Sequence, residues 1–564
     1  MSSYSSQNRD RHAEGFVWGI VVAVLLLFSF APSLYELLRK ADLHNNREFE
    51  LVHNFPTDYN FYLSRIREGL EGRWTVVERY TAEPHDGSFI HAFYLLLGRV
   101  GAWVRVPVWR AGDVYHIARL VLSGTLLVII VALCRQAFGK KTFPWQIAAF
   151  LAAVTASSWP KLTAVVGGSI VPATLENIAA WRFGGYMAWW SVMDSLQRMS
   201  FIPHLVAGQA MMGVLIMAVT RKAWLKKTSL LLLTGILAFG LGMIFPPGLL
   251  FIYAVMGWYF VLAGEDRKSL LVPYGAIVLM SVPSLLYLAL MTSIYPWKRL
   301  AEVDIIRPLP FDYLEYVRAL GPVFPLGIMG LIAALLMWQT ALLPLIAWVL
   351  AWGTLLLVFN YIPQQSPLRF SEMIPHVPLG ILTVFLFSIP KGIGKKLSVI
   401  ILVLLIGTGL FHMYSSLLWQ KDFVDHKIRA TLPLVPTGSY VMYPLKDFVS
   451  AIRYLAEVTG GKGVILSETT AGNYIPVISG NTVYLGHDNT VAFEGKKEKV
   501  KEFFSGRMTD VTAREWLRMT SASYVFYGPQ EREDNAGKSL SYPFLSEVYK
   551  NSMVTVYRVE YDTP

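Results

Sequence analysis

Long apolar stretches separated by short polar connections run along most of the chain. A membrane-spanning helix needs about 20 predominantly apolar residues, and fewer when flanking groups snorkel. On that criterion about eleven helices are predicted to cross a membrane. They lie at 16–38, 115–135, 143–159, 202–220, 228–246, 248–263, 269–293, 320–338, 340–359, 376–390 and 397–415. The pattern therefore predicts a polytopic α-helical membrane protein.

One further apolar stretch, Ser88 to Val104, has two interpretations. Its sequence, "SFIHAFYLLLGRVGAWV", is short and is interrupted by Arg99. We predict a helix that lies at the outer membrane surface. The alternative is a true span, which would move every later basic group to the opposite side.

Lys and Arg residues predict the orientation, because they gather in cytoplasmic connections. Four connections carry such groups, at 135–141, 221–227, 267–268 and 391–396. They place the N-terminal tail, 1–15, in the cytoplasm. With an odd number of spans, the region after 415 lies outside, and one miscounted span would invert this.

Polar residues are concentrated in the segments that this topology places outside the cytoplasm. These are 39–114, 160–201, 294–319 and 360–375, followed by the C-terminal region 416–564. We therefore predict a transmembrane domain at 16–415 with a large first outside loop, and a separate soluble domain at 416–564.

The C-terminal region alternates strand-like and helical patterns. The strand-like runs are "GVILS", "TVYLG", "SYVFYG" and "MVTVYRV", and the charged helical patterns are "EGKKEKVKEFFSG" and "TAREWLRM". This alternation is typical of a small α/β domain.

Composition supports the membrane assignment and excludes other classes. The 564 residues are 54% hydrophobic and 16% charged, which is too apolar for an ordinary soluble chain. The net charge of +11 is scattered in short groups without a basic helix, so no nucleic-acid partner is predicted. The lone Cys134 excludes an intrachain disulfide. Walker, Rossmann and Ser-His-Asp spacings are absent from the sequence.

Asp58 is the first candidate for chemistry. It lies in "NFPTDYNFYLSRIREGLEG", Asn54 to Gly72, where Pro56 and Thr57 mark a helix start. One interpretation is a first-turn acid stabilised by the helix dipole. The other is a functional carboxylate at the membrane surface.

Two more acids follow in "ERYTAEPHDGSFIHAF". Glu83 and Asp86, with His85 between them, supply candidate bases, acceptor contacts or cation ligands. Solvated loop residues are the alternative, and the histidine spacing does not match a zinc motif.

Arginine and aromatic residues occur together in the later outside segments. Arg binds phosphate, and aromatic faces stack on sugars, although Trp and Tyr also form the interfacial belt. The candidates are Arg182, Arg198, Trp189 and Trp190 in the second segment and Arg299 in the third.

The arrangement resembles the GT-C superfamily of membrane glycosyltransferases, which includes the oligosaccharyltransferase catalytic subunit and the protein-mannosyl and aminoarabinose transferases. The match consists of a first span, an outside segment opening with "TDYNFYLSRIREGLEGRW", a surface helix ending in "LLLGRV", and a second span beginning "YHIARLVLSG". The chain departs from some of those families in having "DY" where they have an Asp-Glu pair. It also lacks a clear second acidic pair in its second outside segment.

The resemblance implies roles for particular residues. Asp58 matches the early acid that serves as catalytic base or orients the acceptor. Arg369, in the late-loop motif "PLRF", matches a basic residue that holds the donor phosphate, and an interfacial anchor is the alternative. Arg182, Arg198 and Arg299 are further phosphate candidates.

The implied reaction is an inverting sugar transfer from a polyprenyl-phosphate-linked donor. The acceptor is a glycan, a lipid or a protein at the outer face of a bacterial or archaeal plasma membrane. Tyr59, Trp189 and Trp190 are candidates for stacking on the sugar. Some members of the superfamily need a divalent cation and others need no metal. If this chain binds one, the resemblance implies Mg²⁺ or Mn²⁺ at the point where Asp58 meets Glu83 or Asp86.

Two other functional classes remain open. A transporter or flippase usually buries ionisable groups at mid-membrane, whereas these spans are nearly free of acids. A non-catalytic envelope assembly protein would tolerate Asp58→Asn. In the C-terminal stretch "SETTAGNYIPVISGNTVYLGHDNT", residues Glu468, Asn473 and His487 either contact an acceptor or serve strand ends and turns.

Overall fold

The computed structural model describes residues 2–139, 143–167, 169–362, 365–436 and 442–561. The chain forms two compact units, and each is described by itself. The first unit comprises Met1–Tyr35, Ile117–Tyr287 and Pro308–Phe423. The second comprises Glu36–His116, Leu288–Arg307 and Val424–Pro564.

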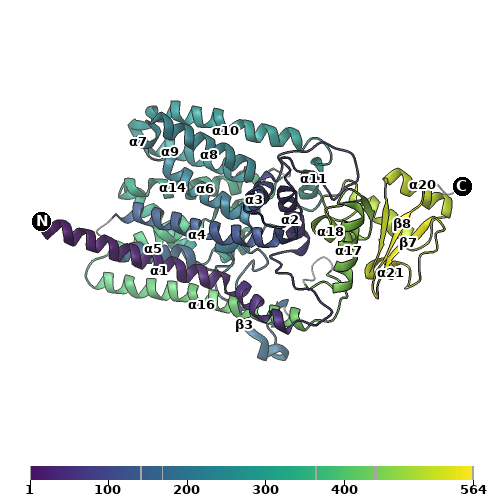
Figure 1. Ribbon diagram of the computed structural model, residues 1–564. Coiled ribbons are helices and arrows are strands. Elements are labelled where there is room, and N and C mark those ends of the chain that lie inside the picture. The colour runs from purple at the N-terminus through teal and green to yellow at the C-terminus, as the bar shows by residue number, and fades with distance from the viewer. Residues whose placement is uncertain (1, 140–142, 168, 363–364, 437–441, 562–564) are drawn as a thin grey trace. The chain divides into compact units, whose positions relative to one another are not determined.

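The first unit is a bundle of apolar helices (Figure 1). Helices α1 (Ser2–Leu38), α4 (Ala111–Phe138), α10 (Leu271–Met291) and α16 (Ile393–Arg429) have part of their length in it. It also contains α5 (Phe143–Thr155), α6 (Pro203–Val219), α7 (Lys222–Leu225), α8 (Thr228–Ile244), α9 (Pro246–Leu262), α12 (Tyr313–Leu320), α13 (Val323–Leu336), α14 (Leu343–Phe359), the 3₁₀ helix η8 (Pro367–Met373) and α15 (His376–Ser388). Every stretch predicted to span a membrane is helical over most of its length, as predicted.

The number of helices that could span a membrane depends on how two bent helix pairs are counted. Among the described residues, five helices are long and apolar enough to cross a membrane. Two bent pairs, α12 with α13 at 80° and η8 with α15 at 57°, would raise the number to seven. Helices α6, α8 and α9 have 17 residues each and α5 has 13, fewer than the roughly 20 that a span needs. The count of about eleven stays a prediction.

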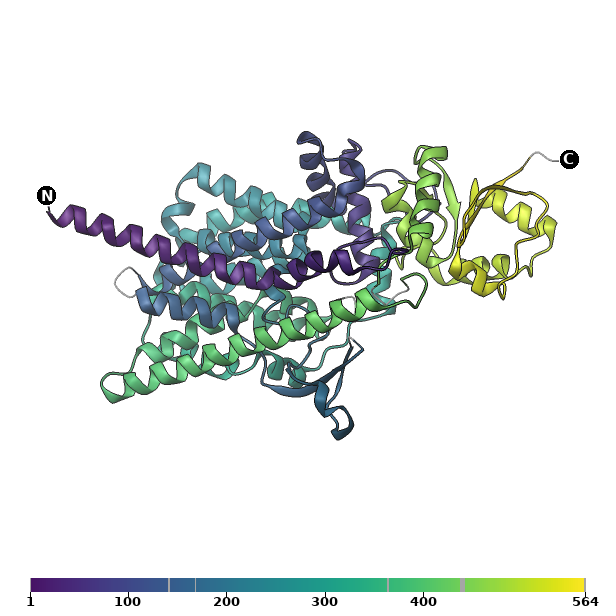
Figure 2. The same cartoon turned by 60° about the horizontal axis from the view of Figure 1, so that its bottom comes forward.

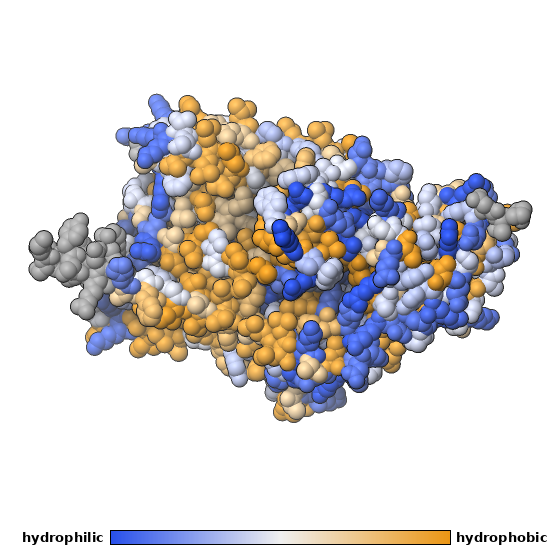
Figure 3. Space-filling view, viewed as in Figure 1, coloured by the Kyte–Doolittle hydropathy of each residue, from blue (hydrophilic) through white to orange (hydrophobic). Residues whose placement is uncertain are grey.

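Hydrophobic residues fill the interior of the bundle and also cover its outside. Gly380 lets α15 approach α5, because a Cβ there would lie 2.7 Å from Ala153 Cα. On the outer faces, Leu279 and Leu336 are 78% and 83% exposed. Figure 3 shows hydrophobic side chains spread over the helices of this unit. An apolar exterior of this extent belongs to an integral membrane protein.

The first unit also carries a small antiparallel sheet, which the sequence pattern did not predict. Strands β1 (Lys161–Val166), β2 (Ser169–Pro172) and β3 (Trp181–Gly184) pair in the order β2-β1-β3. In the register, Thr163 lies opposite Arg182. This sheet lies beside α16 (Figure 2), and the Ser415 hydroxyl of that helix donates to the Phe183 carbonyl.

The second unit combines helices with a five-stranded mixed sheet. Its helices are α2 (Pro56–Leu70), α3 (Ala92–Trp103), α11 (Lys298–Ile306), α17 (Lys446–Thr459), α18 (Thr469–Ile478), α19 (Phe493–Phe504), α20 (Asp510–Thr520) and α21 (Pro529–Asp534). Its strands are β4 (Val464–Leu466), β5 (Thr482–Val483), β6 (Tyr524–Tyr527), β7 (Leu545–Lys550) and β8 (Thr555–Val559), in the order β5-β4-β6-β8-β7. The four predicted strands and two predicted helices are confirmed, and β7 was not predicted.

The second unit differs from the predicted division of the chain. The first outside segment and the C-terminal region were expected to be separate parts, but they share one compact unit with 288–307. The reason is burial: twelve of the fifteen residues of α2 are buried, partly against α3 and partly against α18. A loop that lay alone on the surface could not bury most residues of a helix.

The ambiguous stretch Ser88 to Val104 contains α3. At Gly98 a Cβ would lie 2.0 Å from the Ile66 carbonyl oxygen, so α2 and α3 touch through their backbones. Leu96, Val100 and Trp103 are 51%, 52% and 69% exposed. The predicted helix is confirmed, and its twelve residues are too few to cross a bilayer.

Candidate functional site

Asp58 lies in the first turn of α2, in the second unit. Pro56 stands at the first helical position, where its fixed φ favours the helix start. Most of α2 is enclosed, yet the Asp58 side chain is 49% exposed. A carboxylate at a helix N-terminus is stabilised by the helix dipole. The Asp58 carboxylate is therefore accessible to solvent, whereas most of the helix that carries it is buried.

His487 is the residue that faces Asp58. The distance from His487 Nε2 to Asp58 Oδ1 is 3.4 Å, and the His487 side chain is only 8% exposed. The ring stacks on Phe61 with centroids 4.8 Å apart. It is held between an aromatic face and the carboxylate.

The backbone around His487 sets which ring nitrogen carries the hydrogen. The Asn489 N–H donates to His487 Nδ1 at 3.1 Å. In the neutral ring, Nε2 therefore carries the hydrogen and directs it toward Asp58. A separation of 3.4 Å is longer than a formed hydrogen bond, and such contacts tighten when substrate binds.

Two asparagines lock the start of α2 to α18. Asn60 Nδ2 donates to Asn473 Oδ1 at 2.8 Å, and Asn473 Nδ2 donates to the Thr57 carbonyl at 3.2 Å. The Tyr80 hydroxyl donates a hydrogen bond to the Asn473 carbonyl at 3.1 Å. Asn473, one of the C-terminal candidates, therefore positions the turn that presents Asp58.

The other acids of the first outside segment are engaged elsewhere or exposed. Glu83 pairs with Lys496 at 2.6 Å. Burial opposes ionisation of Glu83, but hydrogen bonds from Lys496 and Thr81 outweigh it and lower the pKa of that carboxyl. His85 Nε2 accepts from the Glu78 N–H at 2.8 Å. Asp86 is an exposed loop residue.

The expected cation site finds little support in these contacts. No group of three or more His, Cys, Asp or Glu side chains among the described residues is arranged to hold a metal. Asp58 faces an imidazole N–H, and Glu83 is held by an ammonium. Mg²⁺ and Mn²⁺ favour sets of oxygen ligands. The residues present therefore do not fit such an ion.

Arg299 supports the loop that carries His487. This arginine is 5% exposed, and its Nε donates to the Asp488 carbonyl at 2.9 Å. Its second nitrogen contacts both carboxylate oxygens of Glu494 at 3.1 Å. Arg299 was predicted as a phosphate contact, and in the structure its guanidinium holds the segment after His487.

Tyr59, predicted to stack on a sugar, is enclosed. Its exposed fraction is 2%, and its ring meets Tyr115 edge-on at 5.1 Å. Its hydroxyl lies 3.3 Å from His116 Nε2. In this arrangement the ring belongs to the core of the second unit.

The remaining predicted residues belong to the first unit. Arg198 is fully buried, and its guanidinium donates to the carbonyls of Val192, Ala156 and Met193. Trp190 Nε1 donates to Ser371 Oγ at 2.8 Å. The neighbouring Trp189 is 49% exposed. Arg198 thus holds backbone segments together, and the half-exposed Trp189 ring lies 6.0 Å from the Trp190 ring, centroid to centroid.

Arg369 and Arg182 retain partial exposure. Arg369 lies in η8 with its NH1 3.6 Å from Glu372 Oε1, and its side chain is 31% exposed. Arg182 lies in β3, 3.2 Å from Asp422 Oδ2, and is also 31% exposed. Asp58 belongs to the second unit and Arg369 to the first, so their action at one site stays a prediction.

Comparisons with known proteins bear on the fold. Scans against models of protein families and a sequence search of curated proteins give no match. Among solved structures, the chain is similar to the archaeal oligosaccharyltransferase AglB from Archaeoglobus fulgidus in complex with an inhibitory peptide and a dolichol-phosphate. That match has 12% identity and a TM-score of 0.50, and it covers 91% of this chain and 69% of AglB.

Two further structures match over almost the whole of this chain. ArnT from Cupriavidus metallidurans, bound to undecaprenyl phosphate, matches with 10% identity and a TM-score of 0.52, covering 97% of this chain and 98% of ArnT. The arabinofuranosyltransferase AftD from Mycobacteria matches with 12% identity and a TM-score of 0.50, covering 96% of this chain and 40% of AftD. The chain therefore has a GT-C-like fold, as the resemblance predicted.

Proposed function

We propose that the chain is a membrane glycosyltransferase that moves a sugar from a polyprenyl-phosphate-linked donor to an acceptor. The observation that carries this proposal is the accessible Asp58 carboxylate, presented by a buried helix and faced by His487 Nε2 at 3.4 Å. The GT-C-like fold supports the same class, because its solved examples include a dolichol-phosphate complex and an undecaprenyl phosphate complex.

In the proposed reaction Asp58 is the general base. It takes the proton of the acceptor as the acceptor atom forms its bond to the sugar C1. The bond between C1 and the phosphate oxygen breaks, and polyprenyl phosphate leaves with the electron pair. A single displacement of this kind inverts the configuration at C1.

His487 positions the base. An Nε2–H aimed at one carboxylate oxygen fixes the orientation of Asp58 and leaves the second oxygen for the acceptor proton. Since the Asn489 N–H occupies Nδ1, the ring is held in this tautomer before substrate arrives.

Arg369 is proposed to bind the donor phosphate. Its guanidinium is partly exposed and lies near the buried Glu372 carboxylate, which restrains its direction. A planar guanidinium contacts two phosphate oxygens at once and stabilises the charge that develops as the donor departs. No step is assigned to a metal ion.

The decisive experiment measures release of polyprenyl phosphate by the purified protein from a panel of polyprenyl-phosphate-linked sugars. Asp58→Asn is expected to abolish release while the protein remains folded. Asp510→Asn is the matched control, because Asp510 is likewise a first-turn acid, in α20. Turnover by Asp58→Asn equal to that of the control would refute the base assignment and favour a transporter or an assembly protein.

A further inference from the structure

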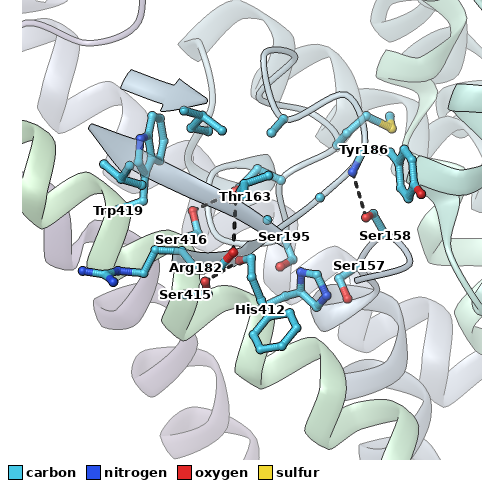
Figure 4. A pocket seen from close by; sticks show the side chains of 18 residues that line it. Ser157, Ser158, Thr163, Arg182, Tyr186, Ser195, His412, Ser415, Ser416 and Trp419 are labelled. Atoms are coloured by element: carbon cyan, nitrogen blue, oxygen red, sulfur yellow. Dashed lines mark hydrogen bonds between the residues drawn. The ribbon is translucent and has the colours of Figure 1, made fainter. Parts of the chain in front are cut away.

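A pocket in the first unit has a lining that no part of the proposed reaction uses. One wall is the sheet β1 to β3 with the loop that follows it, and the other is a face of α16 (Figure 4). His412, Ser415, Ser416 and Trp419 line the pocket from α16. Their spacing of three, four and seven residues places them on one side of the helix.

Three buried nitrogen atoms of this lining are available for hydrogen bonds with an occupant: Trp419 Nε1 and Arg182 Nε carry hydrogens, and His412 Nε2 donates or accepts according to the tautomer of the ring. His412 Nε2, Trp419 Nε1 and Arg182 Nε are buried atoms without a hydrogen-bond partner among the described residues. His412 as a whole is 7% exposed. Figure 4 shows its ring beside Ser157 and Ser195. A buried polar group without a partner is unfavourable, so an occupant of the pocket is expected to form hydrogen bonds with these nitrogen atoms.

The charges of the described lining cancel. It contains one cation, Arg182, and one anion, Asp194. Arg182 is paired with Asp422 at 3.2 Å. The Asp194 carboxylate accepts from the N–H groups of Leu196 and Gln197 at 2.8 and 3.0 Å and from the Ser416 hydroxyl at 2.7 Å. Both charged groups of the lining thus already have partners, which leaves neither of them open to a charged ligand.

The lining offers aromatic surface and hydroxyl groups as well. Tyr186 and Trp419 contribute rings, and Ser157 and Ser195 contribute hydroxyls that both donate and accept. A sugar ring has hydroxyls that accept from N–H groups and donate to oxygens, and it has apolar C–H faces that pack on aromatic rings. A phosphate or carboxylate matches only the donors.

We propose that this pocket is a binding site for a neutral sugar ring, with Trp419 and Arg182 donating to its oxygens and His412 Nε2 forming a hydrogen bond with one of its hydroxyls. The site goes beyond the proposed transfer at Asp58 and does not depend on it. It gives the chain a glycan contact in the first unit that is built from β3 and α16.

Equilibrium dialysis with radiolabelled methyl glycosides of glucose, galactose, mannose and arabinose tests the proposal. The full-length protein is kept in a detergent without a sugar headgroup, which removes competition from the detergent. Saturable binding of at least one glycoside is expected, with no displacement by inorganic phosphate at equal concentration.

Two variants address Trp419 and His412 separately. Trp419→Phe keeps an aromatic ring and removes the N–H, and His412→Phe removes the imidazole nitrogen. Each is expected to weaken binding about tenfold, the loss typical of one hydrogen bond to a fixed partner. Tyr414→Phe, on the same helix with Tyr414 50% exposed, is the matched control and is expected to bind as wild type.

The outcomes separate this site from the proposed function. Asp58→Asn is expected to bind glycosides unchanged even where it abolishes turnover. Absence of saturable binding, displacement by phosphate, or unchanged binding by both Trp419→Phe and His412→Phe would overturn the proposal. Because Trp419→Phe is a mild change, it keeps the test valid if His412→Phe fails to fold.

Discussion

His487 Nε2 and Asp58 Oδ1 lie 3.4 Å apart, and the contact joins a loop near the end of the chain to the first turn of α2. Phe61 stacks on the imidazole, and the Asn489 N–H occupies its other nitrogen. Phe61 and the Asn489 backbone thus fix the orientation of the ring. In the proposed reaction, the second oxygen of Asp58 takes the acceptor proton.

Substitution of His487 tests whether it positions the base. His487→Phe keeps the stacking on Phe61 but removes the N–H, and it is expected to lower kcat by about 10² with little change in KM. His487→Gln restores an N–H donor, and its kcat is expected to be about tenfold higher than that of His487→Phe. The measurement is steady-state release of polyprenyl phosphate. Equal kcat for both variants would assign His487 a purely structural role.

Arg369 is expected to act on the binding of the donor. Arg369→Lys keeps a charge but loses the planar two-nitrogen contact, and it is expected to raise KM for the lipid-linked sugar about tenfold. Arg369→Gln is expected to raise it about a hundredfold. Arg221→Gln, a substitution of an exposed arginine of the same unit, serves as the control. A fall in kcat at constant KM would place Arg369 in the chemistry rather than in binding.

Much of the fold follows from local patterns in the sequence. The apolar stretches became helices because periodicity and length determine that choice locally, and the strands of "SYVFYG" and "MVTVYRV" follow from β-branched and aromatic runs. The sheet β1 to β3 was not predicted. Its strands have four to six residues, and the turn and pairing that create them carry weak local signals.

The candidate site was only partly accessible to sequence reasoning. The place of Asp58 at a helix start was predicted from the sequence. His487 was predicted only as an acceptor contact or a turn residue, and its place beside Asp58 was not predicted. Their pairing depends on the packing of α18 against α2. It also depends on the packing of α18 against the segment that leads to His487, where a Cβ on Gly472 would lie 1.9 Å from the Leu485 carbonyl oxygen. The buried states of Arg198 and Arg299 likewise come from tertiary contacts, which a single sequence does not encode locally.

A buried ion network that includes residues of α2 is expected to contribute strongly to stability. Glu68 lies 3.4 Å from Arg65 and 3.3 Å from Arg79, and the Glu68 and Arg65 side chains are fully buried. Glu68→Gln removes the carboxylate that these two buried cations share, although Arg65 keeps Glu78 at 2.6 Å and Arg79 keeps Glu71 at 2.7 Å. Loss of a fully buried ionic partner is expected to cost about 3 kcal/mol. We expect a clear fall in the thermal unfolding temperature. Glu71→Gln is the control, since Glu71 is 26% exposed and its loss is expected to cost about 1 kcal/mol.

If the two variants unfold at the same temperature, burial of the Glu68 ion pairs does not contribute more to stability than the partly exposed pairs of Glu71. The comparison is informative because Glu68 lies in the last turn of α2, Glu71 directly follows that helix, and both pair with Arg79. They differ chiefly in burial.

The C-terminal part of the second unit contains a buried acid that is expected to make its stability pH-dependent. Glu531, in α21, is 1% exposed, and its carboxylate oxygens accept from the N–H groups of Glu468 and Gly528. Burial outweighs these hydrogen bonds and raises the pKa of Glu531 from 4.5 to about 7. Burial, reinforced by the charge of Glu531, also raises the pKa of Glu468.

Because folding raises the pKa of Glu531, its contribution to stability is complete below pH 4.5 and is lost as the pH rises toward 7. A shift of this size corresponds to about 3 kcal/mol. We expect protection from hydrogen exchange in the peptides covering β6 and α21 to fall between pH 5 and pH 8, after correction for the intrinsic exchange rate. Glu531→Gln, which cannot ionise, is expected to flatten this dependence. Glu533→Gln, at an exposed position on the same helix, is expected to leave it unchanged. A pH dependence that survives Glu531→Gln in full would assign the effect to other groups.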